Sequence, residues 1–149
     1  MARFRIRNDA RTWFKQIAGD FNTEFDQYYF CLMAGFASAR SNETGATAEI
    51  VENFVDDYKE ASRFLIGLLV MAELRKAGID ISERDAVREM FRRLISPHSP
   101  NQLTDEGMRR MNAYASGGYD FLAENREDRP FTSGEFLRDY ALLIDGAAA

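Results

Sequence analysis

Apolar residues recur at helical spacing along most of the chain, and this pattern predicts an all-α protein. Only residues 2–7, which alternate arginine with apolar residues, have the period of two that is typical of extended chain. The predicted architecture is a compact bundle or orthogonal array of five to six helices with a short extended N-terminal arm. The helical segments are 9–18, 23–40, 47–77 with a break near 62, 82–95, 104–116 with 119–124, and 132–144.

Capping residues sharpen the ends of these segments. Ser82, Thr104 and Thr132 each precede a periodic run and can accept a hydrogen bond from an orphan backbone N–H group. Segment 23–40 has large apolar residues on one face and small residues on its back, so we expect it to be the central helix. Gly117-Gly118 either ends a helix or marks a place where two backbones approach closely.

The length of 149 residues fits one helical domain over 1–149, and no linker divides the chain. Within it, residues 1–8 form the extended basic arm, and residues 145–149 are expected to be a disordered tail. An isolated strand leaves its backbone groups unpaired, so the arm has to pair with another chain or lie over the helices.

Composition narrows the class of protein. Hydrophobic residues make up 46% of the chain, enough for a folded core, and the single cysteine excludes an intramolecular disulfide. No apolar run approaches the length of a membrane span, and the N-terminus lacks the apolar region of a signal peptide. We therefore expect a cytoplasmic protein with no membrane association.

The residues that usually perform catalysis are scarce, so the sequence predicts no catalytic site and no cofactor. The chain has no phosphate-binding loop, no glycine-rich dinucleotide turn and no zinc-protease motif. His98 lies in a proline-flanked loop, and Cys31 lies in an apolar helix where an inert buried thiol is the ordinary interpretation. Binding is a better expectation than enzymatic activity.

An acidic stripe is the one candidate metal site. If residues 47–61 are helical, spacings of three and four place its carboxylates on one face, where they could hold Mg²⁺. A small all-α nucleotide hydrolase is the corresponding alternative function, although the paired acidic motifs of such enzymes are present only as a fragment. A solvated helix face is the ordinary interpretation. The residues are Glu49, Glu52, Asp56 and Glu60.

Two groups of arginines are candidates for contact with nucleic acid. The arm carries one group, and the predicted helix 82–95 carries the other at spacings of four, which place it on one face. Interleaved Glu83, Asp85 and Glu89 offer local ion pairs as a competing explanation. The net charge of −5 argues against a general nucleic-acid coat protein. The candidates are Arg3, Arg5, Arg7, Arg84, Arg88 and Arg92.

Consecutive aromatic residues in the central helix suggest a protein interface. Tyr28, Tyr29 and Phe30 cannot all point in one direction, so this helix presents large apolar side chains on at least two faces. Other helices packed around it explain this pattern, and so does a partner protein or a second copy of the chain.

The leading hypothesis is a non-catalytic helical subunit or adaptor of a larger assembly, with DNA modification or defence complexes as suitable settings. It would bind a protein partner, or form a homo-oligomer, and contact nucleic acid through its basic arm. A homodimeric DNA-binding regulator and the Mg²⁺-dependent hydrolase are the alternatives.

Overall fold

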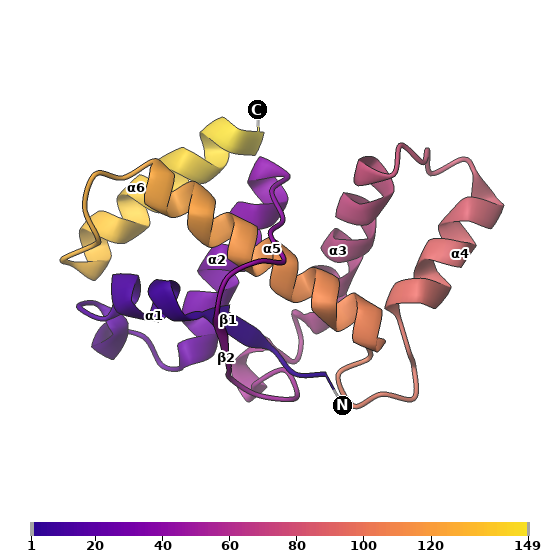
Figure 1. Cartoon of the computed structure of the whole chain (residues 1–149), viewed down its shortest axis with the longest axis horizontal. Helices are drawn as coiled ribbons and strands as arrows, with labels where there is room; N and C mark the ends of the chain where they lie inside the picture. Colours follow the sequence, from indigo (N-terminus) through magenta and orange to yellow (C-terminus); the bar gives the residue numbers. More distant parts are fainter. Residues whose placement is uncertain (1, 149) are drawn as a thin grey trace. The chain divides into compact units, whose positions relative to one another are not determined.

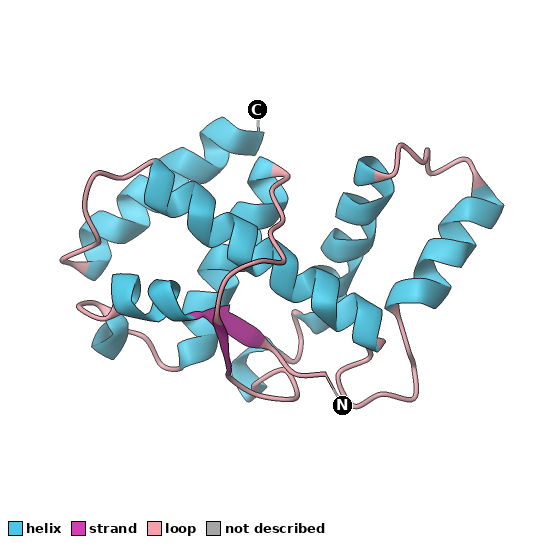
Figure 2. Cartoon of the chain, viewed as in Figure 1, coloured by secondary structure: helices cyan, strands magenta, loops and turns pink. Residues whose placement is uncertain are grey.

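The computed structural model describes residues 2–148 and confirms the all-α class. Figure 2 shows helix over most of the chain and one pair of short strands. None of the described helices is both long enough and apolar enough to cross a membrane. The α-helices are α1 (Asn8–Phe14), α2 (Glu24–Ser38), α3 (Ser62–Lys76), α4 (Arg84–Leu94), α5 (Asp105–Glu124) and α6 (Ser133–Ala148) (Figure 1).

The chain packs as two compact units, and each unit is built from two separate segments of sequence. The first unit comprises residues 2–4 and 51–111, and the second comprises residues 5–50 and 112–148. Helix α5 contributes its first turns to the first unit and its remainder to the second. The division lies inside a helix rather than in a linker, so a search for composition shifts finds no boundary.

In the second unit, the arm pairs with a later segment of the same chain. Strand β1 (Arg5–Arg7) runs antiparallel to β2 (Thr47–Glu49), with Ile6 opposite Ala48. Ile6 is buried, whereas the arginines beside it are partly exposed, as the alternating pattern predicts. The pairing satisfies the backbone of the arm within the chain, without a second molecule.

An aromatic cluster fills the core of the second unit. The rings of Phe14 and Phe30 meet the fully buried Phe136 edge to face at centroid distances of 5.3 and 5.2 Å. The hydroxyl of Tyr140 donates a hydrogen bond to the carbonyl of Phe30 over 2.9 Å, which ties α6 to α2. Edge-to-face packing of this kind adds to the stabilisation from area burial.

Helix α2 has the position expected of a central helix, and its contact with α5 explains the glycine pair. A Cβ atom on Gly118 would overlap the carbonyl oxygen of Cys31, and one on Gly35 would overlap the backbone of Tyr114. Helix α5 continues without interruption through Gly117-Gly118. The glycines therefore mark close backbone approach, the second of the two predicted interpretations.

In the first unit, α3 packs on α4, and the start of α5 completes the core with Met108 and Met111. Glu73 of α3 and Arg110 of α5 form a buried ion pair, with 2.7 Å between Oε1 and Nε. Helix α5 begins as predicted, because the hydroxyl of Thr104 accepts the N–H of Gly107 over 2.9 Å.

The predicted helix over 47–61 is wrong. Residues 47–49 form β2, residues 50–55 are irregular, a 3₁₀ turn covers Asp56–Tyr58, and α3 begins only at Ser62. The β-branched residues Ile50, Val51 and Val55 favour extended chain, and pairing with β1 overrides the helical spacing.

Residues 64–71 are apolar at nearly every position, and such a run predicts a fully buried helix; the structure buries only one face of it. Leu65, Ile66, Leu69 and Val70 are buried, but Phe64 is 61% exposed. One buried face accommodates only part of a helix that is apolar on nearly every side.

The last helix differs at its end. It begins after the predicted cap, since the hydroxyl of Thr132 accepts the N–H of Glu135 over 3.3 Å. It continues to Ala148, whereas the sequence suggested a disordered tail over 145–149, of which residue 149 lies outside the described residues. Alanine has the highest helix propensity, which explains the extension through Ala147 and Ala148.

Candidate nucleic-acid interface

Helix α4 is held by one narrow apolar face. Met90 and Leu94 are buried, Ala86 and Val87 are half-buried, and α4 packs with this face on α3. The remaining positions of the helix are exposed to solvent. The helix begins at Arg84, two residues after the predicted cap Ser82, because Glu83 turns back and its carboxylate accepts the N–H of Asp80 over 2.6 Å.

The exposed side of α4 separates basic from acidic residues. At 100° per residue, Arg84, Arg88 and Arg92 share one flank with Phe91, whereas Asp85 and Glu89 lie on the next flank. Within the described part of the chain, Arg84 and Arg88 form no ion pair, and Arg92 meets Glu89 at 3.5 Å with 76% of its side chain exposed. The local ion pairs that the sequence offered therefore neutralise at most one of the three arginines.

Phe91 has helical spacing with the buried apolar residues of α4, but its side chain does not point inward with them. Its side chain is 45% exposed, on the same flank as the arginines. Met90 and Leu94 already fill the contact with α3, so a third large side chain finds no room on the buried face. An aromatic ring among unpaired cations is the combination that binds nucleic-acid bases and phosphates together.

The start of α4 has no side-chain cap, and its first turn carries both Arg84 and Asp85. The first backbone N–H groups of a helix carry a partial positive charge, and Glu83 does not cap them. Arg84 is placed where its charge is unfavourable to the helix, because a carboxylate is the residue that stabilises this end. A bound anion would relieve that repulsion.

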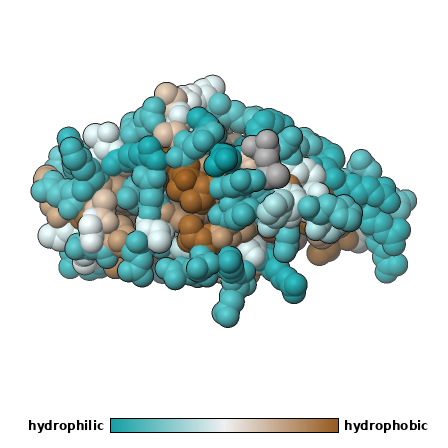
Figure 3. All heavy atoms as spheres, turned by 90° about the horizontal axis from the view of Figure 1, so that it is seen from below, coloured by the Kyte–Doolittle hydropathy of each residue, from teal (hydrophilic) through white to brown (hydrophobic). Residues whose placement is uncertain are grey.

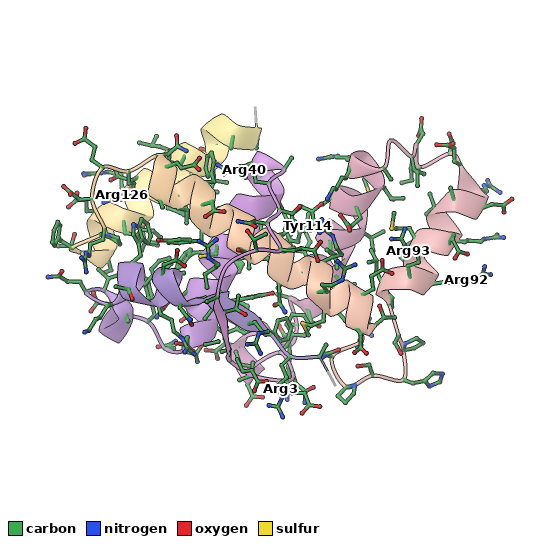
Figure 4. The ribbon with its side chains drawn as sticks, viewed as in Figure 1. Arg3, Arg40, Arg92, Arg93, Tyr114 and Arg126 are labelled. Carbon is green, nitrogen blue, oxygen red and sulfur yellow. The ribbon has the colours of Figure 1, made fainter. Side chains whose placement is uncertain are left out.

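Arg93, next to this face, has a structural role. It points to a different side of α4 from Arg92 (Figure 4), and its Nη2 lies 2.8 Å from Oε1 of Glu106 at the start of α5. The hydrogen bond with Arg93 lowers the pKa of Glu106, and the same bond raises the pKa of Arg93. Two adjacent arginines thus divide into one that joins helices and one that faces solvent.

The predicted arm site does not come together as a cluster of available cations. Arg7 is largely buried and binds both Asp9 and Asp120, at 2.7 and 3.0 Å, and its pKa is raised chiefly by the hydrogen bond with Asp9. Arg5 lies 2.8 Å from the hydroxyl of Thr47 and 3.4 Å from Glu49. These two side chains have partners within the second unit, and their contact with nucleic acid stays a prediction.

Arg3 belongs to the first unit, where it lies 3.8 Å from Glu52 and keeps 45% of its side chain exposed (Figure 4). A long, exposed ion pair of this kind contributes little to stability and exchanges readily for another anion. The contact of Arg3 with nucleic acid stays a prediction.

The predicted protein interface at Tyr28, Tyr29 and Phe30 lies mostly inside the second unit. Tyr28 is fully buried, and its hydroxyl donates a hydrogen bond to Oδ1 of Asn112 over 2.8 Å. Phe30 packs against Phe136 and Tyr140. Tyr28 is thus a core residue and not an interface residue, whereas Tyr29 and Phe30 are both half-buried and keep the predicted role as a hypothesis.

The acidic stripe does not assemble. Glu49 lies on β2, Glu52 in the irregular segment, Asp56 in the 3₁₀ turn and Glu60 before α3, so the four share no helix face. Within residues 2–148, no group of three or more acidic, histidine or cysteine side chains could hold a metal ion. Glu49, Glu52 and Asp56 instead lie near Arg5, Arg3 and Lys59.

Cys31 is buried against α5, and burial raises the pKa of its thiol well above the ordinary value. We therefore expect the native thiol to react with Ellman's reagent at least about 100-fold more slowly than in denaturant, because reaction requires opening of the core. Absorbance at the release band of the reagent, with and without urea, measures this ratio. Similar rates in both solutions would contradict the buried position.

The sequence pattern placed the three arginines of α4 on one helix face, which the structure confirms, while their contact with nucleic acid stays a prediction; the exposed Phe91 beside them was not singled out. The helical spacing of Phe91 is compatible with both the buried and the exposed face of α4. The signal that could have indicated its exposure is that the buried face has room for only a few large side chains. Comparison with known proteins assigns no relative: no family model, no curated protein and no solved structure matches this chain.

Proposed function

We propose that this protein is a non-catalytic, nucleic-acid-binding subunit of a larger assembly, and that α4 carries the contact. The observation that supports the proposal most is the flank of α4 where Arg84 and Arg88, without ion pairs in the described chain, adjoin Arg92 and the exposed ring of Phe91. Arginines four residues apart are offset by about 6 Å along a helix, so each can reach a separate phosphate.

Single-stranded nucleic acid is the preferred class of ligand. Backbone phosphates would bind the guanidinium groups, and an unstacked base would stack on Phe91. A duplex offers the same phosphates but keeps its bases stacked, so it would use only the arginines. Helices α3 and α4 are joined by residues 77–83, a connection longer than the turn of a helix-turn-helix motif, which argues against base reading in the major groove.

Exposed apolar side chains support the second half of the proposal, membership of an assembly. Phe64 and Met71 of α3, seven residues apart, are 61% and 37% exposed in the first unit, and Gly67 lies between them on the same face. Figure 3, in which no residue is labelled, shows in addition one face of the molecule where hydrophobic residues reach the surface among hydrophilic ones. Exposed aromatic and methionine residues are typical of surfaces that contact other proteins.

Fluorescence anisotropy with a labelled oligonucleotide of about 30 nucleotides tests the binding. We expect the triple variant R84Q/R88Q/R92Q to bind at least about 10-fold more weakly in low salt, and to reduce the slope of log affinity against log salt by about 2 to 3. We expect F91A to weaken binding to single strands by roughly 5- to 100-fold and to leave duplex binding nearly unchanged.

The matched control is K15Q/R63Q/R129Q, which removes the same charge from three other exposed positions. It should retain most of the affinity. If both triple variants lost the same affinity, net charge alone would explain the loss, and α4 would be excluded as the site. No binding by the wild-type chain at low salt, to either single or double strands, would exclude the function.

A further inference from the structure

The exposed side of α6 repeats the pattern of a helix that packs against another helix. Phe136, Tyr140, Leu143 and Ala147 face the core and are buried or half-buried. A second apolar stripe, rotated by roughly 100° from the first, consists of Leu137, Ala141, Ile144 and Ala148. Its spacings of four, three and four are those of the apolar seam in a coiled coil.

This stripe is open to solvent within the chain. Leu137 is 44% exposed, Ala141 and Ala148 are exposed, and Ile144 is half-buried. On the other side of α6, the preceding segment 125–131 and the helix together form a groove. Glu135, Asp139 and Leu142 are the residues of α6 that line it. None of the four stripe residues lines this groove, so the stripe lies on a different side of α6 from it.

We infer that the occupant of this stripe is α6 of a second copy, packed antiparallel about a two-fold axis. The register that places Leu137 against Ala148 of the second copy also places Ala141 against its Ile144. Each layer then combines one large and one small side chain, which is the complementarity that close helix packing needs. An isologous contact of this kind repeats both layers by symmetry.

The charges beside the stripe select the same register. Arg138 and Asp145 lie on one edge of it, seven residues apart, and Arg138 has 74% of its side chain exposed with only a 4.0 Å approach to Asp139. Within the described residues, Asp145 forms no ion pair. In the antiparallel register, Arg138 of each copy lies beside Asp145 of the other, so the dimer has two reciprocal ion pairs. In a parallel pair this edge of one helix would face the other edge of its partner, so Arg138 and Asp145 would not meet.

The size of the interface sets the expected affinity. Sixteen residues at 1.5 Å per residue give a helix of about 24 Å. One helix pair of this length lies at the small end of specific interfaces, so we expect a reversible dimer with a dissociation constant on the order of micromolar.

Sedimentation equilibrium of the full chain between about 1 and about 200 µM tests the inference. We expect the wild type to dimerise across this range. R138D and D145R should each weaken the dimer by at least about 10-fold, and the charge-swapped R138D/D145R should return to within about 3-fold of the wild type. Circular dichroism would verify that each variant keeps its helices.

A leucine pair supplies the matched control. L137D should abolish the dimer, whereas L142D should leave it intact, although Leu142 is the more exposed of the two at 68%. A wild type that stays monomeric at about 200 µM would overturn the inference. Failure of the charge swap to restore the dimer, or equal effects of L137D and L142D, would overturn this surface and register.

Discussion

Replacing Gly118 by alanine is expected to destabilise the protein by about 3 kcal/mol or more, the largest effect among the single substitutions considered. The added methyl group would overlap the carbonyl oxygen of Cys31 and would lie 2.5 Å from the amide nitrogen of Gly35. Both neighbours are backbone atoms of α2, so no side chain can rotate away. The two helices would have to separate, which would open the aromatic core of the second unit.

Thermal unfolding followed by circular dichroism measures the effect, and a fall in Tm of roughly 10 °C is expected for a chain of this size. The matched control is Gly67→Ala in α3, where no atom lies within 4 Å of the added Cβ. Alanine should stabilise that helix by about 0.5–1 kcal/mol. A variant G118A that unfolds at the wild-type temperature would contradict the close contact between α2 and α5.

Local patterns predicted most of the helices because each depends on residues near in sequence. Thr104 and Thr132 cap their helices as expected. The glycine pair was ambiguous for a physical reason: two glycines lower helix propensity, but packing against α2 outweighs that preference. Propensity describes the isolated helix, and the partner that needs the small residues lies far away in sequence.

The segment 47–61 shows where local reasoning fails. Its apolar residues have helical spacing, and local sequence does not indicate which distant segment will pair with the arm. Once β1 takes Thr47–Glu49 as its partner, the helix cannot form and the acidic stripe is dispersed. The arm was correctly predicted as extended, but the same pairing places Arg5 and Arg7 in internal contacts.

The basic face of α4 was predictable because it needs only one helix with arginines at spacings of four. Which of its arginines lack an ion pair was not predictable, since the partner of Arg93 is Glu106 in another helix. Arg84 and Arg92 have acidic neighbours in sequence that resemble those of Arg93, and only tertiary packing decides which arginine is neutralised. The exposure of Phe91 also depends on tertiary packing, because the contact between α4 and α3 has no room for another large side chain.

Replacing Glu73 by glutamine is expected to destabilise the protein by about 3 kcal/mol, with a change in side-chain volume close to zero. Glu73 and Arg110 have only 9% and 8% of their side chains exposed, and two of their atom pairs lie within 3.3 Å. Glutamine keeps the shape but removes the charge, so the buried guanidinium of Arg110 loses the carboxylate that lies 2.7 Å from its Nε. Denaturation by urea, followed by circular dichroism, measures the loss.

Two further variants separate the buried charge from other causes. The apolar pair E73L/R110M should restore stability to within about 1 kcal/mol of the wild type, because a buried ion pair is costly to desolvate and packed apolar groups replace it well. Glu106→Gln, which breaks the more exposed pair with Arg93, should cost about 1 kcal/mol or less. If E73Q were as mild as E106Q, water would have to reach Arg110, and the ion pair could not be the buried link between α3 and α5.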